Sequence, residues 1–265
     1  MCHGKGDQKR LRRNSLFHVV SLFKHDFNEP IYYKVKTNNL LVKYYFYALG
    51  ILGRIPISCF KNSFRYEVND RIVTIPFAMQ NLHMERGQTV LDFGCNESKF
   101  SIELASYGYK VTGVDLANYD FRHRNFSFKK GNFLDNDFEN ESFAAVVAIS
   151  SVEHVGLGSY NSSKFPGGDR KVVDEMYRIL KNKGVLLITV PFAREYHEDT
   201  FERTYDDNAL HNLVSMFKIT KEEYFIRNRD KAEWLPCTKD QMLQDTTDQQ
   251  NGVEGVACLV CLKHP

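Results

Sequence analysis

From Thr89 onward, two hydrophobic patterns alternate along the chain. Short runs of Val, Ile, Leu, Ala and Phe, typical of buried strands, are followed by segments whose apolar residues lie at helical spacing. The expected strands are 89–94, 109–115, 126–132, 143–150, 185–190, 217–227 and 255–262, and the expected helices are 98–108, 169–184 and 206–217. This alternation predicts an α/β fold, with a Rossmann-like, doubly wound, mostly parallel seven-stranded sheet. Asp169 stands where it could cap the second of these helices.

The first part of the chain lacks this alternation. Residues 1–15 are basic and polar, and we expect a disordered tail there. We expect residues 16–80 to form a helical or cap-like extension, and residues 81–265 to form the α/β domain. The most apolar stretch, residues 40–60, is too interrupted by charged residues and proline for a membrane-spanning helix. It predicts a helix packed on the domain or across a homodimer, with a helix lying on a membrane surface as the alternative.

Composition and charge narrow the class of protein. The chain is 43% hydrophobic and 26% charged, which is typical of a soluble globular protein, and no secretory signal is visible. We therefore expect free thiols and a cytoplasmic location, with membrane association through residues 40–60 as the alternative. Cys258 and Cys261 have the spacing of metal ligands, but strand residues three apart point to opposite faces, so no metal site is expected there.

The charge is distributed unevenly along the chain. Residues 1–80 carry 13 Lys and Arg against 5 Asp and Glu, and the remainder carries 22 against 28. The basic front predicts either contact with an anionic partner, such as nucleic acid, or simply a solvated tail.

Polar residues mark the edge of the predicted sheet where its strands end. Ligands of doubly wound sheets bind beyond this edge. The first strand brings Asp92, Gly94, Cys95 and Asn96 there, and Asp115 ends the second strand. A carboxylate at the second position can accept hydrogen bonds from both hydroxyls of a ribose. With only one glycine, the first turn has no loop for a pyrophosphate, so the pattern favours adenosine carrying an amino-acid tail whose ammonium faces Asp92.

Several segments together resemble the class I methyltransferases that depend on S-adenosylmethionine (SAM). They are VLDFGCNES, VTGVDLANY, KKGNFLD, FAAVVAISSVEHVGLG and EMYRILKNKGVLLITVPF, and the resemblance covers residues 75–217. It implies SAM as cofactor and a SAM site lined by Asp92, Gly94, Asp115, Leu116, Asn132, Phe133 and Ser150. The chain departs from the family pattern at Asn96 and Ser98, which replace glycines, and at Asn132, which replaces an Asp that holds the adenine amino group.

The residues after the fourth and fifth strands are candidates for acceptor chemistry. His154 has the intrinsic pKa of a general base, and Glu153 could orient it, although the pair could also simply cap the loop. His197, Arg203 and Tyr205 follow the fifth strand at the same edge and are expected to bind the acceptor. For Arg203 we weigh two roles: binding an anionic acceptor and forming a structural salt bridge.

The same residues leave several functions open. The segments SSVEHVGLG and ERTYD resemble bacterial-type methyltransferases linked to cell-surface sugar modification, which implies O-methylation of a small polar or carbohydrate-like acceptor with His154 as base. One alternative is a metal-assisted RNA 2′-O-methyltransferase, with Glu153, His154 and His197 as ligands and the basic front on RNA phosphates. Another is a SAM-fold binding subunit without catalysis.

Overall fold

The computed structural model describes residues 18–23, 32–36, 63–65, 69–96, 98–228, 233–245 and 255–264. The chain divides into two compact units, Met1–Asn69 and Asp70–Pro265. In the first unit, β1 (His18–Phe23), β2 (Tyr32–Lys36) and β3 (Ser63–Arg65) form an antiparallel sheet in the order β1-β2-β3. These strands lie where the sequence predicts a helical or cap-like extension. The predicted tail at 1–15 and the predicted helix at 40–60 lie outside the described residues.

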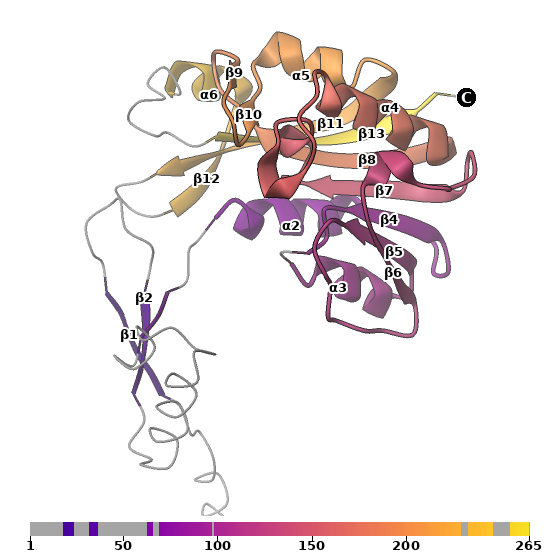
Figure 1. Cartoon of the computed structure of the whole chain (residues 1–265). Coiled ribbons are helices and arrows are strands. Elements are labelled where there is room, and N and C mark those ends of the chain that lie inside the picture. The colour runs from indigo at the N-terminus through magenta and orange to yellow at the C-terminus, as the bar shows by residue number, and fades with distance from the viewer. Residues whose placement is uncertain are drawn as a thin grey trace, which may run out of the picture. The chain divides into compact units, whose positions relative to one another are not determined.

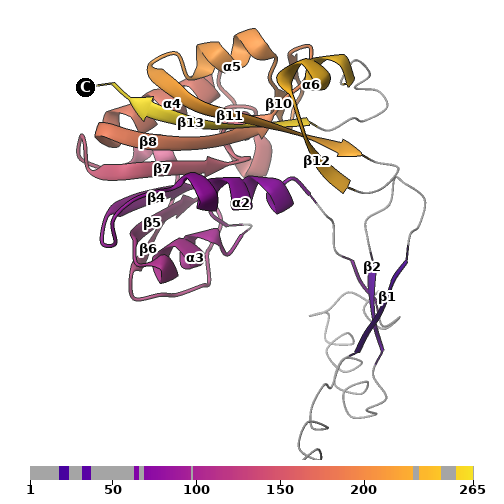
Figure 2. The same ribbon diagram turned by 180° about the vertical axis from the view of Figure 1, so that it is seen from behind.

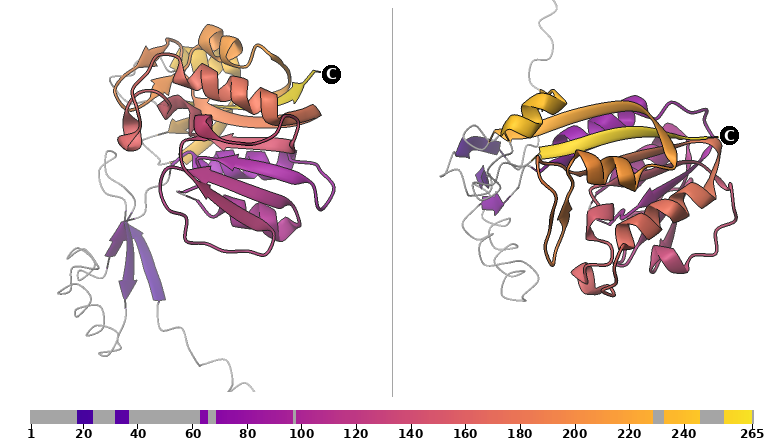
Figure 3. Two further views of the ribbon diagram at one scale, coloured as in Figure 1. Left: turned by 45° about the vertical axis from the view of Figure 1, so that its right-hand side comes forward. Right: turned by 90° about the horizontal axis from the view of Figure 1, so that it is seen from above.

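A twisted eight-stranded sheet forms the centre of the second unit (Figures 1 and 3). Its order is β12-β11-β13-β8-β7-β4-β5-β6. The strands are β4 (Thr89–Phe93), β5 (Lys110–Asp115), β6 (Phe126–Lys130), β7 (Phe143–Ile149), β8 (Leu180–Pro191), β11 (Phe217–Asn228), β12 (Glu233–Cys237) and β13 (Gly255–Lys263). Strands β4 to β8 pair in parallel, and the last three pair antiparallel. This confirms the predicted Rossmann-like fold.

The strand that the sequence pattern does not predict is β12, which adds an eighth strand at one edge. Its sequence, EWLPC, is short and contains Pro236, which cannot donate a backbone hydrogen bond. An edge position tolerates such a residue because one side of the strand needs no partner.

Helices cover both faces of this sheet (Figures 1 and 2). One core lies under α2 (Arg71–Asn81) and α3 (Phe100–Tyr107), and the other lies under α4 (Gly168–Ile179), α5 (Asp207–Leu213) and α6 (Lys239–Asp245). Helix α2 buries Phe77 and Ala78 in the first core, so it belongs to the second unit. The unit therefore begins at Asp70, before the predicted boundary at 81.

Two further predictions concern single residues. Asp169 does not cap α4: the N-cap is Gly167, whose φ of 65° is left-handed, and Asp169 lies in the first turn. Cys258 packs in the core under α2 and α3, and Cys261 in the core under α4 and α5. The two thiols thus lie on opposite faces of β13, as predicted. Among the described helices, none is long and apolar enough to cross a membrane.

Short elements complete the edge where the parallel strands end. They are the 3-10 turns η2 (Phe133–Asp135), η3 (Val152–His154) and η4 (Ser159–Asn161) and the hairpin of β9 (His197–Glu198) and β10 (Arg203–Thr204). The strand order reverses between β4 and β7, which are neighbours in the sheet. Strands β5 and β6 follow β4 on one side, and β8 follows β7 on the other. In doubly wound sheets, ligands bind at such a switch point.

Candidate active site

Asp92 lies at the end of β4 with its carboxyl group almost fully buried. The Oγ of Ser101 on α3 donates a 2.5 Å hydrogen bond to its Oδ2. Burial raises the pKa of Asp92 to about 7, and this rise is only partly offset by the Ser101 hydrogen bond and the charge of Arg71. Because a nearby cation favours the ionised form of a buried carboxyl, this position suits an ammonium group.

The turn after β4 depends on the neighbouring β7 loop. Gly94 has a φ of 72°, and a Cβ at this position would clash with Ser151 Oγ. The glycine is therefore required by Ser151, in addition to any close approach of a ligand. Cys95 is buried, and its Sγ would be 2.8 Å from a Cβ on Gly113, so the thiol fills the space beside that glycine.

Asp115, at the end of β5, holds the same turn from the other side. Its Oδ2 accepts a 2.9 Å hydrogen bond from Asn96 N, and its Oδ1 accepts one of 2.8 Å from Ala117 N. Each carboxylate oxygen has a further lone pair, so both can also accept from the hydroxyls of a ribose. The adjacent Leu116 is 41% exposed, so it leaves an apolar side chain open to solvent beside this turn.

Asn132 and Phe133 form the turn after β6. Asn132 Oδ1 accepts from Leu134 N at 3.2 Å, and its Nδ2 donates to Asp135 Oδ2 at 3.0 Å. The side chain that replaces the family's Asp therefore caps η2. Phe133 is buried and meets Phe93 edge to face, with ring centroids 5.1 Å apart.

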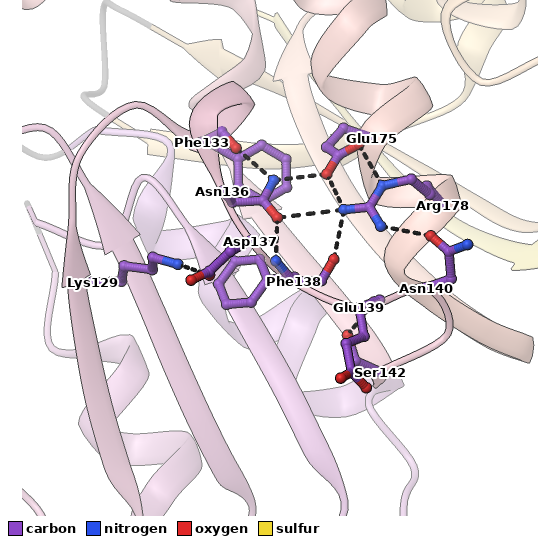
Figure 4. A network of polar contacts seen from close by, with 10 residues as sticks. All are labelled: Lys129, Phe133, Asn136, Asp137, Phe138, Glu139, Asn140, Ser142, Glu175 and Arg178. Atoms are coloured by element: carbon purple, nitrogen blue, oxygen red, sulfur yellow. Dashed lines mark hydrogen bonds and ion pairs between the residues drawn. The ribbon is translucent and has the colours of Figure 1, made fainter.

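A polar network ties this turn to α4 (Figure 4). Asn136 Nδ2 donates to Phe133 O at 2.6 Å and to Glu175 Oε1 at 2.7 Å. Arg178 binds both oxygens of Glu175, at 2.8 and 2.5 Å, and also donates to Phe138 O at 2.8 Å. The adenine-side turn is thus fixed by the helix that covers it.

Ser150 stands at the end of β7 with a strained φ of 45°. Its backbone N–H lies 3.1 Å from Thr189 O and 3.0 Å from Thr189 Oγ1, and its hydroxyl donates to Asp70. Asp70 and the following Arg71 begin α2 at this edge. Sequence reasoning missed both residues, because neither belongs to a motif and only the fold brings them here.

Glu153 and His154 lie next to one another in η3. Glu153 is 1% exposed, and burial raises the pKa of its carboxyl well above the ordinary value, which favours the neutral form. Within the described part of the chain, its Oε2 has no hydrogen-bond partner. His154 Nδ1 lies 2.7 Å from Phe201 O, and its Nε2 lies 4.0 Å from Glu153 Oε1.

Arg203 is buried beneath this loop. Its Nη1 donates to the carbonyl oxygens of Glu153, at 3.1 Å, and Val155, at 2.8 Å. Its Nε donates to Glu198 Oε2 at 2.8 Å and lies 3.6 Å from Asp169 Oδ2. These contacts match the structural alternative for Arg203, because the guanidinium is occupied in holding η3.

The other two predicted acceptor residues occupy different environments. Tyr205 is buried, and its hydroxyl donates to Asp169 Oδ2 at 2.9 Å. His197 is exposed on β9, opposite Thr204. Across the residues that the structure describes, no group of three or more His, Cys, Asp or Glu is arranged to hold a metal ion.

Comparison with known protein families finds a match for the part of the chain that contains most of this sheet edge. Residues 91–188 match the family model described as a methyltransferase domain. This segment is therefore similar to methyltransferase domains. SAM is its cofactor, and the residues present fit it: Asp92 for the ammonium, Asp115 for the ribose and Leu116 for the adenine.

Individual relatives of the methyltransferase domain are distant. A SAM-dependent Diels-Alderase, iccD of Talaromyces variabilis, is 28% identical over 105 residues, which are 39% of this chain and 36% of that protein. A sterol 24-C-methyltransferase of Candida albicans is 25% identical over 140 residues, which are 48% and 34%. The chain thus spans about a third of the length of these curated relatives. The solved structure of the cyclase SpnF shares the fold, with a TM-score of 0.54, 16% identity and coverage of 73% of this chain and 80% of that one.

Proposed function

We propose that the protein transfers the methyl group of SAM to a hydroxyl group of a small polar or carbohydrate-like acceptor, with His154 as general base. Methyl transfer is an in-line displacement, so the site must align the acceptor with the sulfonium and remove the hydroxyl proton. The acceptor would enter beside η3, which follows β7 next to the proposed SAM site.

One observation carries this proposal: the short contact between His154 Nδ1 and Phe201 O. A carbonyl oxygen can only accept, so Nδ1 must carry the proton. In the neutral ring, Nε2 is then the basic nitrogen, which a general base requires.

The neighbouring carboxyl supports the same role. Nε2 and Glu153 Oε1 are 4.0 Å apart, too far for a direct hydrogen bond. In the proposed complex, the acceptor oxygen would lie about 2.8 Å from both atoms, where a neutral Glu153 would donate to it and it would donate to Nε2. The burial of Glu153 favours the neutral form that this arrangement needs.

The test is SAM turnover with hydroxyl-bearing acceptors, followed as S-adenosylhomocysteine formation. His154→Ala should lower turnover by about 10²–10⁴ while SAM affinity is kept. His83→Ala, at an exposed histidine in the loop after α2, is the matched control and should change neither quantity. Full turnover of His154→Ala would contradict the proposal.

Two other functions give different results in the same assay. If turnover is lost with a chelator and restored by a divalent metal, Glu153, His154 and His197 act as ligands, as in the RNA-type alternative. The names of two similar proteins, a Diels-Alderase and a cyclase, favour a second alternative in which SAM is bound without methyl transfer. That function predicts SAM binding without S-adenosylhomocysteine formation for any acceptor.

A further inference from the structure

An aromatic cluster surrounds His154 on the acceptor side. Its ring centroid lies 5.2 Å from that of Tyr160 and 4.7 Å from that of Phe201, and the latter two are 5.6 Å apart. Tyr160 is 53% exposed and Phe201 is 49% exposed, so about half of each side chain faces solvent. Exposed aromatic side chains gathered beside a proposed catalytic group are characteristic of ligand sites.

The backbone that presents these rings is held in a specific conformation. Tyr160 has φ 54° and ψ 32°, a left-handed conformation that a bulky residue rarely adopts. Ser159 Oγ donates to Phe201 O at 2.7 Å, which joins η4 to the hairpin. On the hairpin, Asp199 Oδ1 accepts from Phe201 N at 2.7 Å and from Glu202 N at 2.9 Å. Strain that surrounding contacts maintain in this way is typical of functional positions.

The stretch of chain that carries Phe201 is acidic. Residues 194–203 carry four carboxylates, Glu195, Glu198, Asp199 and Glu202, against the two arginines Arg194 and Arg203. Arg203 is buried and bonded to Glu198 and to backbone carbonyls. Two backbone N–H groups lower the pKa of Asp199, so it stays ionised. This acidic surface disfavours the anionic acceptor that Arg203 alone would suggest.

We infer that the rings of Tyr160 and Phe201, with the acidic residues of the hairpin, bind a cationic ammonium group of the acceptor. The inference rests on the proposed function, since it places the hydroxyl of the same molecule at His154. The negative faces of aromatic rings attract cations, and an ammonium over two rings gains more than a neutral group of equal shape. The substrate class is thereby narrowed to hydroxyl-bearing amines, such as amino alcohols or amino sugars.

The test compares two probes of nearly identical shape, choline and its uncharged isostere 3,3-dimethylbutan-1-ol. Calorimetry is carried out on the full chain saturated with S-adenosylhomocysteine, so no methyl transfer is needed. Choline should bind at least about fivefold more tightly than the isostere. Equal affinity for both probes, or no measurable choline binding, would overturn the inference.

Variants locate the binding to the aromatic cluster. Phe201→Leu and Tyr160→Leu keep an apolar side chain but remove the ring, and each should weaken choline binding about five- to thirtyfold without affecting the isostere. Tyr107→Leu, at a tyrosine that is 60% exposed at the end of α3, is the matched control and should have no effect. If both ring variants bind choline like the wild type, the cation lies elsewhere and the inference is wrong.

The outcome is separable from that of the proposed function. If choline binds more tightly than the isostere but no acceptor gives S-adenosylhomocysteine, the ammonium site is supported and the proposed methyl transfer is wrong. His154-dependent methylation of a neutral acceptor, without choline discrimination, would do the reverse.

Discussion

The two sides of the candidate site are built in different ways. The cofactor side, at the ends of β4, β5 and β6, consists of turns that directly follow strands within one stretch of chain, Thr89–Asp135. The acceptor side joins η3 and η4 to Asp70, Asp169 and the β9–β10 hairpin, which are distant in the sequence. Backbone hydrogen bonds shape the first side, and buried ionic contacts hold the second.

Because of this difference, we expect substitutions to have different effects on the two sides. On the cofactor side, a substitution removes a contact to the ligand together with hydrogen bonds to the backbone of exposed turns, such as those that Asp115 accepts from Asn96 N and Ala117 N. On the acceptor side, removal of one buried charge leaves its partners without compensation, and the surrounding loop loses its support.

The largest effect is expected from Arg203→Met. It removes a buried cation that bonds two backbone carbonyls and Glu198, so we expect a loss of about 3 kcal/mol in the free energy of unfolding. For a unit of this size, that corresponds to a fall in Tm of about 6–12 °C, measurable by calorimetry. Arg194→Met, at an exposed arginine just before the hairpin, is the control. Equal melting of the two variants would show that Arg203 does not support the acceptor side.

On the cofactor side, the main effect of Asp115→Ala should be on ligand binding, because it removes the proposed ribose acceptor and the side chain that holds Asn96 N in the turn. Loss of a charged hydrogen-bond acceptor for the ribose should cost about 1.5–3 kcal/mol, which is about ten- to a hundredfold in the Kd for SAM. Asp120→Ala changes an exposed acid in the next loop and should leave the Kd unchanged. The Kd is measured by calorimetric titration of S-adenosylhomocysteine into both variants. An unchanged Kd for Asp115→Ala would show that Asp115 does not bind the ribose.

The pKa of Asp92 gives a third, smaller effect. The ligand-free carboxyl has a pKa of about 7, and the ammonium of SAM prefers the ionised form, so binding below pH 7 releases a proton. SAM affinity should therefore rise about tenfold between about pH 5.5 and 7. The affinity of Asp92→Asn should be flat over this range.

The same pKa affects stability with the opposite sign. Because the folded pKa lies above the usual value of 3.8, the ligand-free protein binds this proton more tightly than the unfolded chain does. Stability should fall as pH rises from about 4 towards 7, and Asp92→Asn should abolish this part of the dependence. A wild-type protein whose unfolding free energy rises over this range, relative to Asp92→Asn, would contradict the assignment.

The smallest effect tests whether α4 positions the adenine-side turn. Arg178→Lys cannot make the paired contact with Glu175 that orients Asn136, so the Kd for SAM should rise about fivefold while turnover at saturating SAM is kept. Arg170→Lys, on the same helix but paired with exposed Asp174, is the control. A change in turnover without a change in Kd would assign Arg178 another role.

The sequence correctly places the residues proposed for the cofactor side at the sheet edge, because they directly follow predicted strands. Gly94 directly follows one predicted strand, and Asp115 ends the next. Each residue can therefore be placed at the sheet edge without knowledge of other contacts. Even there, the contact of Ser151 with the Gly94 position was not predictable, since it joins turns after two different strands.

The acceptor side was predicted only in part, for the same reason. His154 and Glu153 were identified by their place after a strand, but the partner of His154 Nδ1, Phe201 O, lies 47 positions away. Asp70 reaches Ser150 across 80 positions. Hydrophobic periodicity carries no information about such pairs, nor about the burial that raises the pKa of Glu153.

The segment that matches the family model, residues 91–188, covers only part of the candidate site. It contains Asp92, Asp115 and His154 but excludes Asp70, Phe201 and Arg203, which complete the acceptor side. Substitutions in α2 and in the hairpin can therefore alter the acceptor side without changing any residue of the segment that matches the family model. The similarity to relatives whose names describe different reactions, a Diels-Alderase and a sterol methyltransferase, extends over about half of this chain or less.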